Sequence, residues 1–126
     1  MEMTWNVFRF DRALTDDEQR KLTKWCAKQF AHSEVDYYFN GDTQFTAGWI
    51  PADTCDELVA RIVRKLPDVT FRLASDWGSE DPGVTYHGAD PLGMEIADLY
   101  EQIGDLQDRV QVLRTTQANR TAAKGD

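Results

Sequence analysis

The stretch 35-VDYYFNGDTQFTAGW-49 decides the kind of sheet that this chain builds. Two runs rich in aromatic and β-branched residues, Val35–Phe39 and Phe45–Trp49, flank the dipeptide Asn40-Gly41. Asn-Gly between two such runs is a strong hairpin signal, because both residues tolerate the positive φ angles of a tight turn. The stretch therefore predicts an antiparallel pair of strands.

A helix is predicted on each side of this hairpin. Thr15–Glu18 and Thr54–Glu57 both read Thr-x-x-Glu, the capping box whose side chains bond to backbone N–H groups at a helix start. Pro51 ends the hairpin, and Pro67 ends the second helix. Apolar residues follow each box at helical spacing: Leu22, Trp25, Cys26 and Phe30 in the first helix, and Leu58, Val59, Ile62, Val63 and Leu66 in the second. Lysines at positions 21, 24 and 28 occupy the other side of the first helix.

Three further segments have the composition of short strands: Trp5–Phe10, Val69–Leu73 and Val84–Tyr86. Together with the hairpin and the helices they give the order β-α-β-β-α-β-β-α. We predict an α+β protein, a ferredoxin-like antiparallel sheet with two packed helices plus a long C-terminal heptad helix. The α+β domain is expected to span residues 1–90.

The last helix is predicted from Asp90-Pro91, a typical helix start, to residue 117, with a flexible tail over 118–126. Its apolar residues repeat at spacings of 3 and 4 and occupy the a and d positions of a heptad pattern: Ile96, Leu99, Ile103, Leu106, Val110 and Leu113. β-branched residues at a with leucine at d favour parallel two-stranded coiled coils. We therefore expect these six residues to form the interface of a homodimer.

Two other interpretations of this helix stay open. Gly104 weakens the helix, and in a parallel pair Arg109 would face Arg114 of the second copy. The same apolar residues would also suit packing on the chain's own sheet, or in a groove on a foreign partner.

Acidic residues follow the opposite side of this helix: Asp98, Glu101, Asp105 and Asp108. The whole chain has 22 acidic and 14 basic residues and a formal charge of −8. It lacks the excess of cations that direct binding to nucleic acid or to an anionic membrane needs. The row predicts a basic or nucleic-acid-binding partner protein, because carboxylates at this spacing resemble a row of phosphates. The alternative is an ordinary solvated helix face.

The sequence predicts a cytoplasmic protein. No apolar run is long enough to cross a membrane, and the N-terminus lacks the pattern of a secretory signal. Cys26 and Cys55 lie inside helical patterns without a Cys-x-x-Cys motif, which indicates reduced thiols.

Between Phe45 and Gly88 the chain carries a set of spaced residues: Phe45, Thr46, Trp49 and Pro51, then Leu66-Pro67, Val69 and Phe71, then Gly83, Tyr86 and Gly88. In these residues the chain resembles a family of small ferredoxin-like proteins of unknown function carried by phages and conjugative plasmids. The resemblance implies a ferredoxin-like fold and an origin in a mobile element. It implies no catalytic residues.

The loop after residue 76 supplies the other candidate contacts. Trp77 is expected either to cover the core or to be an exposed contact residue, and with Tyr86 it forms a candidate anchor pair for a partner. The acidic residues Asp76, Glu80, Asp81 and Asp90 lack EF-hand spacing, so no metal is predicted. His32, near the end of the first helix, is assigned to that helix's dipole. No motif for a cofactor or for nucleophilic catalysis is present.

We therefore expect a non-enzymatic, acidic protein-interaction module. Its concrete form is a phage or mobile-element inhibitor of a host nucleic-acid-binding protein, of the anti-CRISPR or DNA-mimic type. The alternative is a small ligand-binding domain or enzyme that uses the loop around Trp77, Asp81 and His87.

Overall fold

A computed structural model describes residues 2–31, 34–78 and 81–124. The chain divides into two compact units, Met1–Met94 and Glu95–Asp126. The first holds the sheet and two helices, and the second consists of most of the third helix. The α+β class, with an antiparallel sheet and a long C-terminal helix, is confirmed. His32 and Glu80 lie outside the described residues.

The sheet of the first unit has five strands in the order β2-β3-β1-β4-β5, and every neighbouring pair is antiparallel. β1 is therefore the central strand, between β3 and β4. The bounds are β1 Met3–Phe10, β2 Asp36–Phe39, β3 Gln44–Pro51, β4 Thr70–Asp76 and β5 Gly83–Gly88.

The predicted hairpin is confirmed as β2 and β3, with Tyr38 opposite Thr46 and Phe39 opposite Phe45. Gly41 has a φ of 77°, a conformation that glycine adopts without strain. The N–H of Asn40 donates to the carbonyl of Gln44 at 2.8 Å and closes the turn. The Asn-Gly dipeptide thus fixes the register of the pair, as expected.

The first helix, α1 (Asp16–Gln29), begins as its sequence predicts. The N–H of Glu18 donates to the Thr15 hydroxyl at 3.2 Å, and the N–H of Thr15 donates to the Glu18 carboxylate at 2.9 Å. The second helix, α2 (Ala52–Lys65), begins two residues before Thr54, so the predicted cap at Thr54 is wrong. Pro51 ends β3 with a φ of −56°, which suits a helix start, and the chain turns directly into the helix there.

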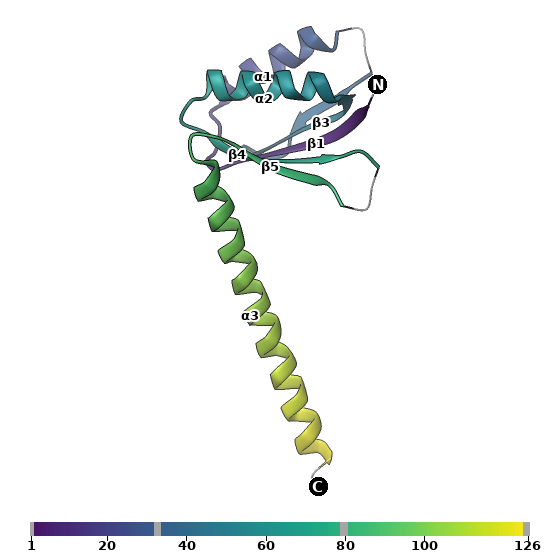
Figure 1. Cartoon of the computed structure of the whole chain (residues 1–126), viewed down its shortest axis with the longest axis vertical. Coiled ribbons are helices and arrows are strands. Elements are labelled where there is room, and N and C mark those ends of the chain that lie inside the picture. The colour runs from purple at the N-terminus through teal and green to yellow at the C-terminus, as the bar shows by residue number, and fades with distance from the viewer. Residues whose placement is uncertain (1, 32–33, 79–80, 125–126) are drawn as a thin grey trace. The chain divides into compact units, whose positions relative to one another are not determined.

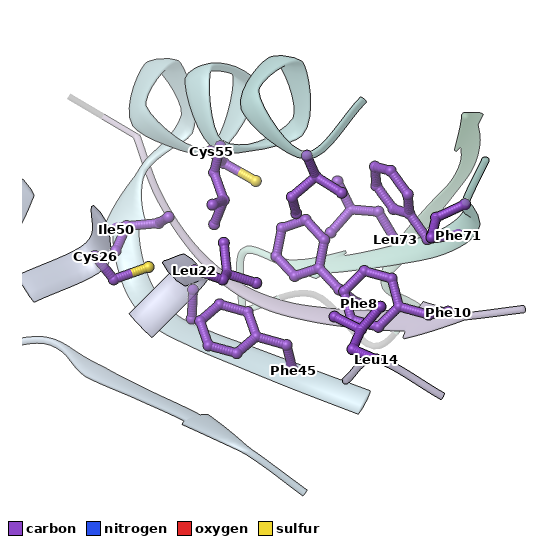
Figure 2. Packing of buried hydrophobic residues seen from close by; sticks show 14 of the residues in the cluster. Phe8, Phe10, Leu14, Leu22, Cys26, Phe45, Ile50, Cys55, Phe71 and Leu73 are labelled. Carbon is purple, nitrogen blue, oxygen red and sulfur yellow. The ribbon is translucent and has the colours of Figure 1, made fainter. Parts of the chain in front are cut away.

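Both helices cover the same face of the sheet (Figure 1). Phe8, Phe45 and Phe71, from three adjacent strands, are fully buried there. The centroid of the Phe8 ring lies 6.1 Å from that of Phe45 and 5.9 Å from that of Phe71. Leu22 and Cys26 from α1 and Cys55 from α2 reach the same core (Figure 2). Alternation in the strands and helical period in the helices therefore bury one contiguous set of apolar side chains.

The third helix, α3 (Pro91–Lys124), begins where Asp90-Pro91 predicts. The N–H of Gly93 donates to Asp90 Oδ1 at 3.1 Å. The helix continues past residue 117, so the segment expected to be a tail is helical as far as Lys124. Alanines at 118, 122 and 123 favour helix there, and the Thr121 hydroxyl donates to the Gln117 carbonyl at 3.0 Å.

Candidate interaction surfaces

The six a and d residues of α3 form what we call the apolar stripe: Ile96, Leu99, Ile103, Leu106, Val110 and Leu113. Each of these side chains is between 46 and 62% exposed. Among the described residues of the second unit, up to Lys124, α3 is the only element, so these residues offer the stripe nothing to pack against. A row of large aliphatic side chains in water is the usual mark of a surface that another chain covers.

The stripe also has the shape of a coiled-coil surface. A shallow hollow on α3 is lined by six residues, of which the first four are Ile103, Leu106, Gln107 and Val110 and the last two are Gln111 and Arg114. The first four are spaced i, i+3, i+4 and i+7. Coiled coils form each hole from four residues of one helix, and a side chain of the facing helix fills it. The spacing of these four residues is therefore that of one coiled-coil hole.

The carboxylate row of α3, Asp98, Glu101, Asp105 and Asp108, lies on the same helix away from the stripe. Glu101, Asp105 and Asp108 are exposed, and Asp98 is half-buried. On a helix these positions are about 5 to 6 Å apart. When the stripe is covered by a second helix, the row stays accessible on the outer side.

Trp77 follows β4 and is 49% exposed, so it does not act as a lid on the core. Its ring lies against Gly83, where an added Cβ would come within 2.9 Å of the indole. The Asp76 carboxylate accepts the N–H of Gly78 at 2.8 Å and shapes this turn. Tyr86, half-buried on β5, pairs in register with Arg72 three residues beyond Gly83. The two candidate anchors thus lie on one hairpin.

The structure does not bring Trp77, Asp81 and His87 into one site. His87 stacks on the buried ring of Phe71 at 5.3 Å, and its Nε2 lies 2.8 Å from the Thr85 hydroxyl. Burial lowers the pKa of His87, which favours the neutral form of the ring. Strand β5 separates it from the loop by four residues, roughly 13 Å of extended chain. These three residues therefore do not form the single site that the ligand-binding or enzymatic alternative needs.

The two cysteines are free and buried. Burial raises the pKa of Cys26 to about 12 and that of Cys55 to about 11. A nucleophilic cysteine needs a lowered pKa, because only the thiolate attacks. Both thiols are therefore structural groups at neutral pH. Within the described residues, no cluster of three or more His, Cys, Asp or Glu side chains is arranged to hold a metal ion.

A buried polar network around Asn6 was not predicted from the sequence. Its Oδ1 accepts hydrogen bonds from Thr4, Ser75 and Cys55, at 3.0, 2.8 and 3.3 Å. Its amide nitrogen donates to the carbonyls of Thr4 and Ala47. The sequence pattern that could have indicated it is the alternation of β1, which places Asn6 on the same core-facing side of the strand as Phe8 and Phe10. A satisfied network of this kind fixes strand pairing.

A strained bulge next to this network was also not predicted. The register of β1 and β3 shifts between Thr4 and Asn6, and Trp49, at the bulge in β3, has a φ of 49°. The Trp5 ring lies over Gly48, where an added Cβ would come within 2.2 Å of it, and meets Trp49 edge-on at 6.0 Å. Glycine at position 48 is therefore required by the close approach of the indole.

Comparison of the chain with protein-family models, with curated proteins and with solved structures gave no match. Among the described residues, no helix is both long enough and apolar enough to cross a membrane. The function is therefore argued from the surfaces themselves.

Proposed function

We propose that this protein is a non-enzymatic interaction module that forms a homodimer through the apolar stripe of α3. The observation that carries the proposal is the exposure of six heptad side chains on a unit that contains no second element to cover them. Most of the stability of a helix in a protein comes from packing of its apolar face. A second copy supplies that packing, with an identical stripe of the same length.

The heptad pattern supports a parallel pair. Isoleucine or valine occupies each a position and leucine each d position, which is the two-stranded preference. A parallel pair places Arg109 next to Arg114 of the second copy, and this repulsion costs a few tenths of a kcal/mol at an exposed site. Burial of a leucine or isoleucine side chain contributes roughly 1.5 to 3 kcal/mol, so the stripe outweighs the arginines.

The mass of the chain in solution tests this proposal. Light scattering is expected to give twice the chain's 14.4 kDa for the native protein, and the monomer mass for a variant with Leu99→Glu and Leu106→Glu. Val112→Glu is the matched control, because Val112 is 63% exposed on α3 but lies outside the a and d positions. A native chain that stays monomeric at high concentration would refute the dimer.

We further propose that the carboxylate row faces a basic, nucleic-acid-binding partner, so that the dimer acts as an inhibitor by DNA mimicry, as in the anti-CRISPR type. Support comes from the exposure of Glu101, Asp105 and Asp108 and from the chain's charge of −8. Proteins captured from a bacterial lysate by the native chain should be released by duplex DNA. They should be lost when Asp98, Glu101, Asp105 and Asp108 are changed to the uncharged amides. Capture of the same proteins by that variant would eliminate mimicry.

We also propose that the first unit is ferredoxin-like and derives from a phage or plasmid. Its strand order supports this fold, since β1, β2, β3 and β4 with α1 and α2 follow the split β-α-β pattern and β5 adds one edge strand. A cytoplasmic location is part of the same proposal, and the two free thiols support it.

A further inference from the structure

A groove of about 670 Å³ runs between α1 and α2 on the outer side of the first unit. Apolar side chains line it: Leu22 and Trp25 from α1, Ile62 from α2, and Leu66 at the C-cap of α2. Trp25 and Leu66 are half-buried, so part of the apolar lining reaches the surface. Arg61 lies over the Trp25 ring at 5.4 Å, a cation–π contact that joins the two walls.

The borders of this groove are basic although the chain is acidic. The lysines at 21, 24 and 28 border it on α1, and Arg61 and Lys65 border it on α2. The lysines therefore adjoin the apolar face of α1 instead of lying on its far side, as their spacing had suggested. Five of the chain's 14 Lys and Arg residues gather here, against a net charge of −8.

The only acidic residue in the lining, Glu18, is already bound. It accepts two hydrogen bonds from Arg12 at 2.8 Å and one from the Thr15 N–H. Lys21 pairs with Asp17 at 3.1 Å. Lys24, Lys28 and Lys65 are exposed and form no ion pair with any residue that the structure describes. Unneutralised cations around an apolar surface are complementary to an anionic ligand that also has an apolar face.

We infer that this groove binds an acidic amphipathic helix of a partner protein, whose apolar residues enter the groove while carboxylates beside them pair with the lysines. The walls are two helices, and a helix in a hydrophobic groove is a common mode of peptide recognition. The lysines on α1 repeat at spacings of 3 and 4, so carboxylates at the same spacing on a facing helix meet them one for one.

The chain's own α3 does not have this arrangement. The four carboxylates of its row lie on the face opposite the apolar stripe, so it cannot place that row and the stripe in the groove at once. A long polyanion is also a poor match, because Asp16 and Asp17 stand in the first turn of α1, next to the groove. A nucleic acid strand that extended past the groove would meet these negative charges.

Two synthetic peptides of about 20 residues and identical composition test the inference on the full chain. Both carry a leucine stripe at helical spacing. In one peptide the glutamates border the stripe, and in the other they lie on the opposite face. Fluorescence anisotropy is expected to show at least tenfold tighter binding of the first peptide, with an affinity that falls as salt is raised.

Paired charge reversals then locate the binding. Lys24→Glu with Lys65→Glu is expected to weaken binding of the first peptide about tenfold. Arg20→Glu with Arg64→Glu makes the same charge change on the same two helices outside the lining, and is expected to change the affinity less than twofold. All four side chains are exposed, so both variants should fold. Circular dichroism of each variant checks this point.

Equal affinities for the two peptides, or equal losses of affinity in the two double variants, would overturn the inference. So would no binding of the first peptide at about 100 µM, which is about the weakest affinity of a useful docking site. Tighter binding of a single-stranded oligonucleotide than of the peptide, lost on Lys24→Glu with Lys65→Glu, would assign the groove to nucleic acid instead. The charge reversals lie on α1 and α2, so a loss of binding confined to Lys24→Glu with Lys65→Glu assigns the peptide to the groove and not to the apolar stripe of α3.

Discussion

In the first unit, Phe8, Phe45 and Phe71 are fully buried, whereas in α3 the six residues of the apolar stripe are about half exposed. Both sets follow the period of their own element, alternation in the strands and a 3-4 repeat in the helix. The difference is that the first unit contains two helices to cover its sheet and the second contains no covering element. Local pattern thus shows that a face will be buried, but the partner that buries it is a separate question.

This contrast has a consequence for stability. The first unit folds on contacts within one chain, so its free energy of unfolding should not depend on protein concentration. A stripe buried by a second copy makes the stability of α3 rise with concentration. Mutations in one unit are therefore expected to leave the other unchanged.

The largest effect is expected from Phe8→Ala. The ring is fully buried between Phe45 and Phe71, and its loss leaves a cavity in the centre of the core. Chemical denaturation should show a loss of roughly 3 to 5 kcal/mol from the unfolding of the first unit. Sedimentation under native conditions should still give a dimer. Dissociation of the Phe8→Ala dimer before the first unit unfolds would show that the two units are coupled.

A smaller effect is expected from acid. Hydrogen bonds from Arg12 lower the pKa of Glu18 from its ordinary value of 4.5 to about 2. Because the folded-state pKa lies below the unfolded one, this stabilisation is complete above pH 4.5 and is lost as the pH falls through 2. Arg12 also pairs with Asp68 at 2.9 Å, so Arg12→Ala should cost about 1 to 2 kcal/mol at pH 7 and flatten the acid dependence.

Urea titrations of the native chain and of the Arg12→Ala variant between pH 2 and pH 7 check this prediction. Arg20→Ala is the control, because Arg20 is exposed and its nearest carboxylate is 3.9 Å away. If the free energy of unfolding depends on pH in the same way in the native chain and in the Arg12→Ala variant, the Arg12–Glu18 pair contributes nothing to stability.

The smallest effect is expected from Arg114→Glu. In a parallel pair this change replaces the repulsion between Arg109 and Arg114 with an attraction on both sides of the dimer. Stabilisation of about 1 kcal/mol is expected, seen as a higher melting temperature of α3 at fixed concentration. In an antiparallel pair these two positions do not face each other. An unchanged melting temperature would therefore contradict the parallel arrangement.

Much of the first unit was predictable because its signals are local. The Asn40-Gly41 turn, the capping box at Thr15 and the start of α3 at Asp90 each depend on a few consecutive residues, and each is confirmed. Thr54 carried the same box pattern and failed, since Pro51 had already started the helix. A capping-box pattern thus predicts a helix start only where no preceding residue has already started the helix.

The features that were missed depend on residues far apart in the sequence. Asn6 receives hydrogen bonds from Cys55 and Ser75, 49 and 69 positions away. The basic groove needs lysines of α1 beside Arg61 and Lys65 of α2. Neither α1 nor α2 alone shows it, because a row of lysines on a helix is usually a solvated face. The distance between His87 and Trp77 likewise depends on the register of β4 and β5, which the sequence alone did not reveal.

The central claim is that the apolar stripe meets the same stripe of a second copy. Oxidation of a Leu106→Cys variant tests it most directly, because d residues of a parallel pair face one another and the native thiols are buried. We predict a covalent dimer for Leu106→Cys, and a monomer for Asp108→Cys, which places the thiol on the outer side of the same turn. Equal yields of dimer from both variants, or none from either, would contradict the account.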